Sequence, residues 1–145
     1  MPVIIDKVES WIKKNEKNLC SVMINIAEHD IDELLNERDK NPFDENWVQA
    51  DKRLEEVKNN LAVMEKSKIN QFSQKIGKRY FKLVIEKSGS SELASYISDD
   101  FRLLAETLSC EIECVFVFSL INAYLKGKMP ENNMKTISYN PSGLY

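Results

Sequence analysis

Residues 47–64 (WVQADKRLEEVKNNLAVM) carry a seven-residue apolar repeat that decides the class of fold. Two sets of apolar residues recur at this interval, namely Trp47, Leu54 and Leu61, and beside them Ala50, Val57 and Met64. Residues spaced in this way share one face of a helix. The stretch therefore predicts a long amphipathic helix, with Asp44 as its N-cap. If the rest of the chain does not cover this apolar stripe, the same pattern predicts a helical homodimer.

The apolar stripe loses its phase at Lys68, and a new stripe begins at Ile69. We therefore expect the helix to bend or restart near residues 66–68. Gly77 lies inside the second stripe. A glycine in an exposed helix costs about 1 kcal/mol relative to alanine, so Gly77 is expected to be a weak point.

Two further helices are expected toward the C-terminus. Residues 88–91 (SGSS) form the clearest linker, and Ser90 or Ser91 can cap the helix that follows. The last helix, Glu111 to Lys126, is apolar on nearly every side, which predicts a central place in a bundle. Gly127 and Pro130 then follow in the order expected at a helix end.

The whole chain is expected to form one all-α domain. Its 145 residues suit a single domain, and only four glycines and four prolines argue against a turn-rich sandwich or barrel. Residues 80–86 and 113–120 could be strands by composition, but their flanks keep the helical period. We predict a bundle of five to six helices over residues 1–128 and an irregular, loosely attached tail over residues 129–145.

Two segments of opposite charge are the strongest functional signal. Residues 28–45 have a local charge of −6, whereas the whole chain carries only −3. The acids of this segment are Glu28, Asp30, Asp32, Glu33, Glu37, Asp39, Asp44 and Glu45. Complementary potentials steer protein partners toward one another, so we predict that these acids contact a basic partner.

The basic segment supports an alternative. Residues 66–87 have a local charge of +6, and Lys75, Lys78, Arg79 and Lys82 lie near Phe72, Tyr80 and Phe81. Basic residues that alternate with aromatic ones can hold phosphates and stack bases. This reading makes the protein a nucleic-acid-associated regulator. However, Phe72 and Tyr80 fall on the apolar stripe, which favours a place in the core instead.

No catalytic or metal-binding pattern accompanies these charges. His29 is the only histidine, and no nucleophile motif matches it. Cys20, Cys110 and Cys114 lack zinc-site spacing and are expected to be reduced, buried thiols. Asp99 and Asp100 are adjacent and are expected to complement a helix dipole. We therefore predict a non-enzyme with no cofactor. The N-terminal residues lack the features of a signal peptide, so a cytoplasmic location is expected.

Two segments resemble small bacterial immunity proteins that are paired with polymorphic and contact-dependent growth inhibition toxins. They are residues 98–106 (SDDFRLLAE) and residues 123–130 (AYLKGKMP). The resemblance implies a small cytoplasmic protein that binds a cognate toxin domain, frequently a nuclease, and blocks it. It implies no binding residues, because interfaces differ among such proteins. The leading prediction is thus a non-catalytic immunity protein, either monomeric or homodimeric, that binds a toxin through its acids.

Overall fold

The computed structural model describes residues 2–26 and 30–145, and within them the chain is entirely helical and irregular, without strands. Six helices have eight residues or more, and a seventh, α2, is a single turn. In chain order they are α1 (Ile5–Leu19), α2 (Val22–Asn25), α3 (Ile31–Arg38), α4 (Phe43–Asn59), α5 (Val63–Ser88), α6 (Ser91–Ser109) and α7 (Val115–Leu125). The predicted all-α bundle is confirmed, and residues 80–86 and 115–120 are helical.

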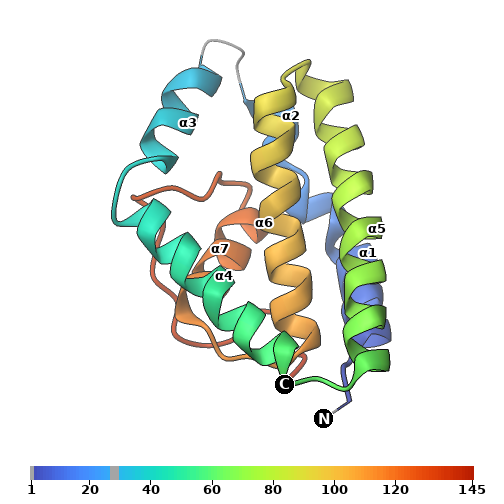
Figure 1. Cartoon of the computed structure of the whole chain (residues 1–145). Helices are drawn as coiled ribbons and strands as arrows, with labels where there is room; N and C mark the ends of the chain where they lie inside the picture. The colour runs from blue at the N-terminus through green and yellow to red at the C-terminus, as the bar shows by residue number, and fades with distance from the viewer. Residues whose placement is uncertain (1, 27–29) are drawn as a thin grey trace.

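Helices α5 and α6 form the antiparallel hairpin on which the bundle is built (Figure 1). The linker between them behaves as its sequence predicts. Gly89 has a left-handed φ of 71°, and its N–H donates to the carbonyl of Ile85. Ser90 then caps α6, because its hydroxyl accepts a hydrogen bond from the N–H of Leu93 at 3.1 Å.

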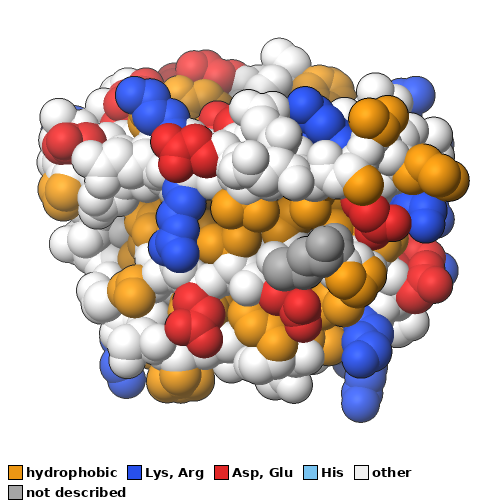
Figure 2. All heavy atoms as spheres, turned by 60° about the horizontal axis from the view of Figure 1, so that its bottom comes forward, with side chains coloured by type: hydrophobic (Ala, Val, Ile, Leu, Met, Phe, Trp, Pro, Cys, Tyr) orange, Lys and Arg blue, Asp and Glu red, His pale blue; other side chains and the backbone are white. Residues whose placement is uncertain are grey.

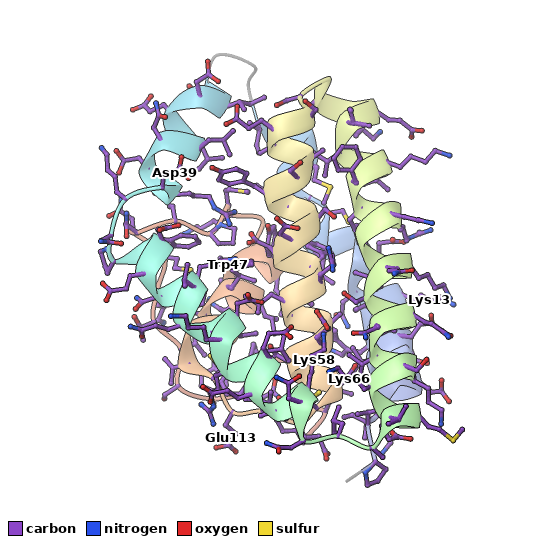
Figure 3. All side chains as sticks on the ribbon, in the orientation of Figure 1. Lys13, Asp39, Trp47, Lys58, Lys66 and Glu113 are labelled. Carbon is purple, nitrogen blue, oxygen red and sulfur yellow. The ribbon has the colours of Figure 1, made fainter. Side chains whose placement is uncertain are left out.

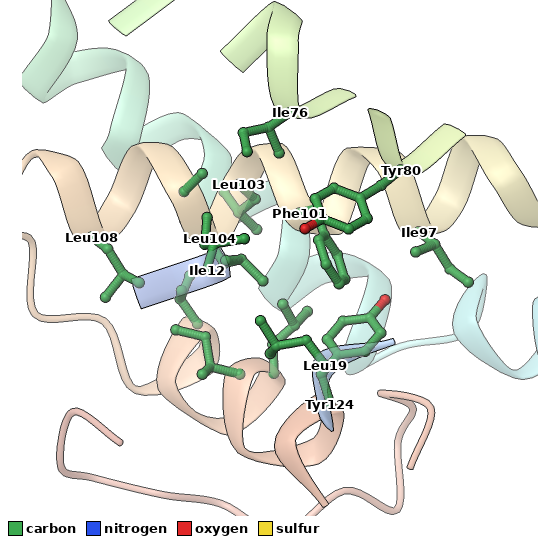
Figure 4. Packing of buried hydrophobic residues seen from close by; sticks show 14 of the residues in the cluster. Ile12, Leu19, Ile76, Tyr80, Ile97, Phe101, Leu103, Leu104, Leu108 and Tyr124 are labelled. Atoms are coloured by element: carbon green, nitrogen blue, oxygen red, sulfur yellow. The ribbon is translucent and has the colours of Figure 1, made fainter. Parts of the chain in front are cut away.

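Helix α6 also packs against α1, α4 and α7, and α7 packs against α1 and α4. An aromatic series crosses this interior. The ring of Phe101 lies 4.2 Å from that of Tyr80 and 4.9 Å from that of Tyr124, between centroids (Figure 4). All three side chains are fully buried, so they join α5, α6 and α7 in one core.

The break between the two apolar stripes comes earlier than predicted. Helix α4 ends at Asn59, and Ala62 is extended, with φ −58° and ψ 148°. The chain turns back at this point instead of bending at residues 66–68. The stripe over residues 47–64 is covered internally as far as Leu61, whereas Met64 is 72 % exposed. A dimer through the stripe is therefore not required.

Two helix starts differ from the prediction. Helix α4 begins at Phe43, after Pro42, so Asp44 lies in its first turn and is not the N-cap. Helix α7 begins at Val115 and not at Glu111, because Glu111 has a φ of 54° and Cys114 is extended. From Val117 to Tyr124 every residue of α7 is buried.

The end of α7 follows its sequence closely. Gly127, with a φ of 71°, donates its N–H to Tyr124, and Lys128 donates its N–H to Ala123 at 2.9 Å. This pair of hydrogen bonds is the Schellman motif, which satisfies the last carbonyls of the helix.

Residues 129–145 are irregular, but the prediction of loose attachment is wrong. Ile137 is buried, and its N–H donates to the hydroxyl of Ser119 at 2.8 Å. Asn132 accepts a hydrogen bond from the N–H of Phe43 and donates one to the carbonyl of Glu37. The segment thereby fastens the end of α3 to the start of α4. This segment shows no apolar period because most of these contacts are individual polar ones.

Candidate functional site

Seven of the eight predicted acids lie within the described residues, on or directly beside two consecutive helices. Glu28 lies outside the described residues. We call the other seven the acidic surface: Asp30, Asp32, Glu33, Glu37, Asp39, Asp44 and Glu45. They occupy α3 with its flanking residues and the first turn of α4, on one side of the bundle (Figure 1). Six are exposed, and Glu37 is partly buried.

Few positive charges offset the acidic surface. Lys40 pairs with Glu37 at 2.8 Å, on the exposed side of the turn. Arg38, the other basic residue of the segment, is only 4 % exposed. Its guanidinium points into the protein, so the exposed side of α3 remains strongly negative.

Arg38 ends at a buried carboxylate in the middle of α6. Its two terminal nitrogens donate to the two oxygens of Asp100 at 2.7 and 2.6 Å. Asp100 is completely buried and also accepts hydrogen bonds from the indole of Trp47 at 2.9 Å and the hydroxyl of Tyr124 at 2.7 Å. One carboxylate thus joins α3, α4, α6 and α7.

The charge of Arg38 is stabilised in this setting. Burial lowers its pKa, but the adjacent Asp100 carboxylate outweighs burial, so the pKa of Arg38 is raised. The guanidinium carbon lies 4.8 Å from the ring centroid of Phe43 and 5.4 Å from that of Tyr96. The Nε atom of Arg38 is buried between these groups without a hydrogen-bond partner in the described protein. Arg38 therefore remains charged and fixes the orientation of α3.

A second contact holds the end of α3. The hydroxyl of Tyr96 donates to Asp39 at 2.5 Å, and this hydrogen bond raises the pKa of Tyr96 to about 12. Together with Asn132 and Arg38, it gives the acidic surface three separate attachments to the bundle. The acids are consequently presented on a fixed backbone.

A recess of about 150 Å³ opens beside the acidic surface, between α3, α4 and α6. Its lining consists of Arg38, Asp39, Phe43, Asp44, Trp47, Tyr96, Asp99 and Asp100. Two of these lining residues, Asp39 and Trp47, are labelled in Figure 3. The recess thus combines four aspartates, one arginine and three aromatic rings.

Asp99 and Asp100 differ from the role predicted for them. Helix α6 begins at Ser91, so neither residue lies in its first turn. Burial raises the pKa of Asp99. Two smaller effects oppose each other, because the charge of Arg102 lowers this pKa and the charge of Asp100 raises it. Sequence reasoning missed the recess because Arg38 and Trp47 lie far from Asp100 in the chain. The available signal was a carboxylate at Asp100, at helical spacing between Ile97 and Leu104 on an apolar face.

Part of the positive charge of the basic segment is neutralised by ion pairs with α1. Lys75 pairs with Glu9 at 2.7 Å, and Arg79 donates to both oxygens of Glu16 at 2.8 and 2.9 Å. Lys78 and Lys82 are exposed. Phe72 and Tyr80 are buried, as their spacing predicted, so they present no surface on which a base could stack.

The lower end of the bundle carries charges of both signs. Figure 2 shows the lower end of the bundle, where a band of apolar side chains is bordered by both acids and bases. A second buried ion pair, between Lys58 and Glu106, lies between α4 and α6. Burial lowers the pKa of Lys58, but the hydrogen bond that Lys58 donates to Glu106, together with the Glu106 charge, raises this pKa overall. Its role is to tie two helices together.

The reactive side chains that the structure describes form no recognisable centre. His29 lies outside the described residues. Cys110 is buried, while Cys20 and Cys114 are partly buried. Burial raises the pKa of Cys20 to about 12 and that of Cys110 to about 11, so both thiols are protonated at neutral pH. In the described part of the chain, no three His, Cys, Asp or Glu side chains gather where they could hold a metal ion.

Comparison with known proteins adds the decisive observation. Residues 8–131 match the model of a family described as immunity protein PIM1. The chain belongs to this family. No curated protein and no solved structure gives a significant match.

The PIM1 match begins within α1 and ends just after Pro130, so it includes the acidic surface, the recess and the core helices. Membership gives the chain an immunity function in general terms, which implies a toxin as its protein partner. The segments on which the sequence resemblance rested are structural in this PIM1 protein. Residues 98–106 belong to α6, and residues 123–130 hold the Schellman motif. None of the helices in the described ranges combines the length and apolar character needed to cross a bilayer.

Proposed function

We propose that this PIM1-family protein neutralises a cognate bacterial toxin domain by direct binding, without catalysis, and that the acidic surface is the contact. The observation that carries the proposal is the placement of the acids. Six exposed carboxylates lie on two helices that three separate contacts attach to the core. A charged surface on a fixed backbone attracts its partner and loses little conformational freedom on binding.

The toxin is a nuclease, and it belongs to a polymorphic or contact-dependent growth inhibition system. A nuclease must carry a basic surface, because phosphate backbones are bound largely through lysine and arginine. Such a surface complements the acidic surface of this protein. A nuclease reaches nucleic acid in the cytoplasm, so the immunity protein acts there. By covering the basic surface, it blocks access of the substrate.

The test uses charge reversal at three exposed acids, of which only Glu45 accepts a side-chain hydrogen bond in the described structure, a long one of 3.5 Å from Gln49 on the same helix. The variant replaces Asp32, Glu33 and Glu45 with lysine. A matched control replaces Glu56, Glu86 and Glu113, which are also exposed but lie outside the acidic surface. Both variants change the net charge by the same amount. The partner is the toxin domain encoded beside the immunity gene, made inactive by substitution at its catalytic centre.

The acidic-surface variant should bind this toxin domain at least ten-fold more weakly at about 150 mM salt, with a flatter dependence of affinity on salt. The control variant should bind like the native protein. Calorimetric titration gives the affinities, and thermal unfolding confirms that both variants are folded. Equal affinities of the two variants would exclude the acidic surface as the contact.

A further inference from the structure

The recess beside the acidic surface has the composition of a site for one cationic side chain. Its lining carries four aspartates against a single arginine. The charge of that arginine is already matched, because both terminal nitrogens of Arg38 are bonded to Asp100. Asp39, Asp44 and Asp99 therefore give the recess an excess of negative charge.

The three carboxylates differ in their hydrogen bonding. The side chains of Asp44 and Asp99 accept no hydrogen bond from any residue that the structure describes, whereas Asp39 accepts one from Tyr96. Asp99 is also partly desolvated, and burial raises its pKa. The charge of Arg102 offsets part of this effect by lowering the pKa of Asp99, and a bound cation would stabilise the carboxylate further.

The aromatic lining favours the same occupant. Phe43, Trp47 and Tyr96 form the walls of the recess. Aromatic faces attract cations, and the attraction strengthens where water is excluded. The rings of Phe43 and Tyr96 already face the guanidinium of Arg38 in this way, at 4.8 and 5.4 Å, so Trp47 is the ring that would face a second cation. Arginine is also among the residues that most often carry the binding energy of an interface, where it fills a desolvated pocket near the centre.

The size of the recess excludes most other ligands. Its volume of about 150 Å³ lies well below the ~300–1,000 Å³ typical of small-molecule sites. A single extended side chain is the better fit. The larger groove between α1 and α5, about 490 Å³, offers no comparable charge, since Glu9 pairs there with Lys75 and Glu65 with Lys68.

We propose that this recess receives one arginine or lysine side chain of the toxin, which anchors the complex. This inference rests on the proposed function, because it assumes that the toxin approaches the acidic surface. It adds a specific contact: Asp44 and Asp99 hold the cation, and Trp47 and Tyr96 enclose its stem. Asp99 thereby becomes a binding residue although it lies on α6 and outside the charged segment.

The recess can be tested without the toxin. The probe is N-acetyl-arginine-N′-methylamide, and the neutral comparison is the corresponding citrulline derivative. The chain has two tryptophans, Trp47 in the recess and Trp11 on α1, so their indole N–H signals report site and background in one NMR spectrum. A Trp11→Phe variant assigns the two signals.

The arginine probe should shift the Trp47 signal in a saturable manner at millimolar concentration and leave Trp11 unmoved. The citrulline probe should produce no such shift. An Asp44→Asn/Asp99→Asn variant should weaken binding of the probe at least five-fold, whereas Glu56→Gln/Glu113→Gln should not. Equal shifts with the two probes, or no effect of removing Asp44 and Asp99, would overturn the assignment of the recess.

Binding of the toxin domain separates this inference from the proposed function. The Asp44→Asn/Asp99→Asn variant should bind the toxin at least ten-fold more weakly than Glu56→Gln/Glu113→Gln. If charge reversal at Asp32, Glu33 and Glu45 weakens binding but Asp44→Asn/Asp99→Asn does not, the recess is refuted and the acidic surface stands. If neither set matters, both proposals fail.

Discussion

Asp100 is the residue on which the position of α3 depends. It accepts hydrogen bonds from Arg38, Trp47 and Tyr124, which come from three other helices, and its own exposure is zero. A buried carboxylate is costly unless charge and hydrogen bonds compensate it. Here each of its oxygens has two donors. The compensation is complete, so its loss should be felt throughout the site.

Replacement of Asp100 by alanine should therefore destabilise the protein by about 3–5 kcal/mol, because Arg38 would be left charged and buried without its partner. Urea unfolding measures the change. The matched substitution Asp99→Ala, at the neighbouring exposed position, should have little effect on stability. If the Arg38 charge causes the loss, Asp100→Ala should be less costly in an Arg38→Met background. Equal costs in the two backgrounds would contradict this account.

Single residues show where sequence reasoning stops. The spacing of Asp100 with Ile97 and Leu104 marks a carboxylate on an apolar face, and that information is local. Its partners are not local, because Arg38 lies 62 positions away and Trp47 lies 53 positions away. A sequence without an alignment cannot pair residues over such distances. The acids of the acidic surface could be listed from the sequence, but the recess beside them could not.

At the scale of elements, Gly77 has a structural role in helix packing that its neighbours in the sequence do not reveal. It lies where α5 meets α6, and a Cβ atom there would come within 2.8 Å of Cδ of Arg102. The hydroxyl of Ser98 donates to the carbonyl of Gly77 at 2.9 Å. Glycine therefore permits the close approach of the two helices. The prediction of a weak point took account of helix propensity and could not include the neighbouring helix.

The effect of Gly77→Ala on stability should consequently have opposite signs in the native protein and in a variant that lacks the Arg102 side chain. In the native protein it should destabilise the fold, because the new methyl group meets the Arg102 side chain. In an Arg102→Ala background the nearest remaining neighbour is Ser98 Oγ, 3.5 Å away, which is an ordinary contact. There the better helix propensity of alanine should stabilise the protein by up to about 1 kcal/mol. Urea unfolding of the four proteins tests this, and destabilisation in both backgrounds would contradict it.

Helix ends were predictable where the signal is local. Ser90 caps α6 and Gly127 ends α7 as expected, because each acts on residues within a turn of itself. The predicted start of α7 at Glu111 was wrong. Glu111 has a left-handed φ, a conformation that a sequence usually signals with glycine. The predicted restart near residues 66–68 failed for a related reason. The turn at residues 60–62 contains neither glycine nor proline.

At the scale of the whole molecule, the two charged segments have unequal roles. The basic segment gives Lys75 and Arg79 to ion pairs with α1, so part of its charge maintains the fold. Fewer charges of the acidic surface are used in ion pairs of the fold, since Arg38 faces inward and Lys40 pairs with Glu37. The molecule therefore presents concentrated exposed negative charge on α3 and the start of α4, which is the surface where we propose that the toxin binds.

Hydrogen–deuterium exchange of the complex with the inactive toxin domain tests this location most directly. The account predicts that toxin binding slows exchange in residues 31–47 and 96–100, which carry the acidic surface and the recess, and leaves residues 66–87 unchanged. Slower exchange confined to residues 66–87 or to α1, with residues 31–47 unaffected, would contradict it.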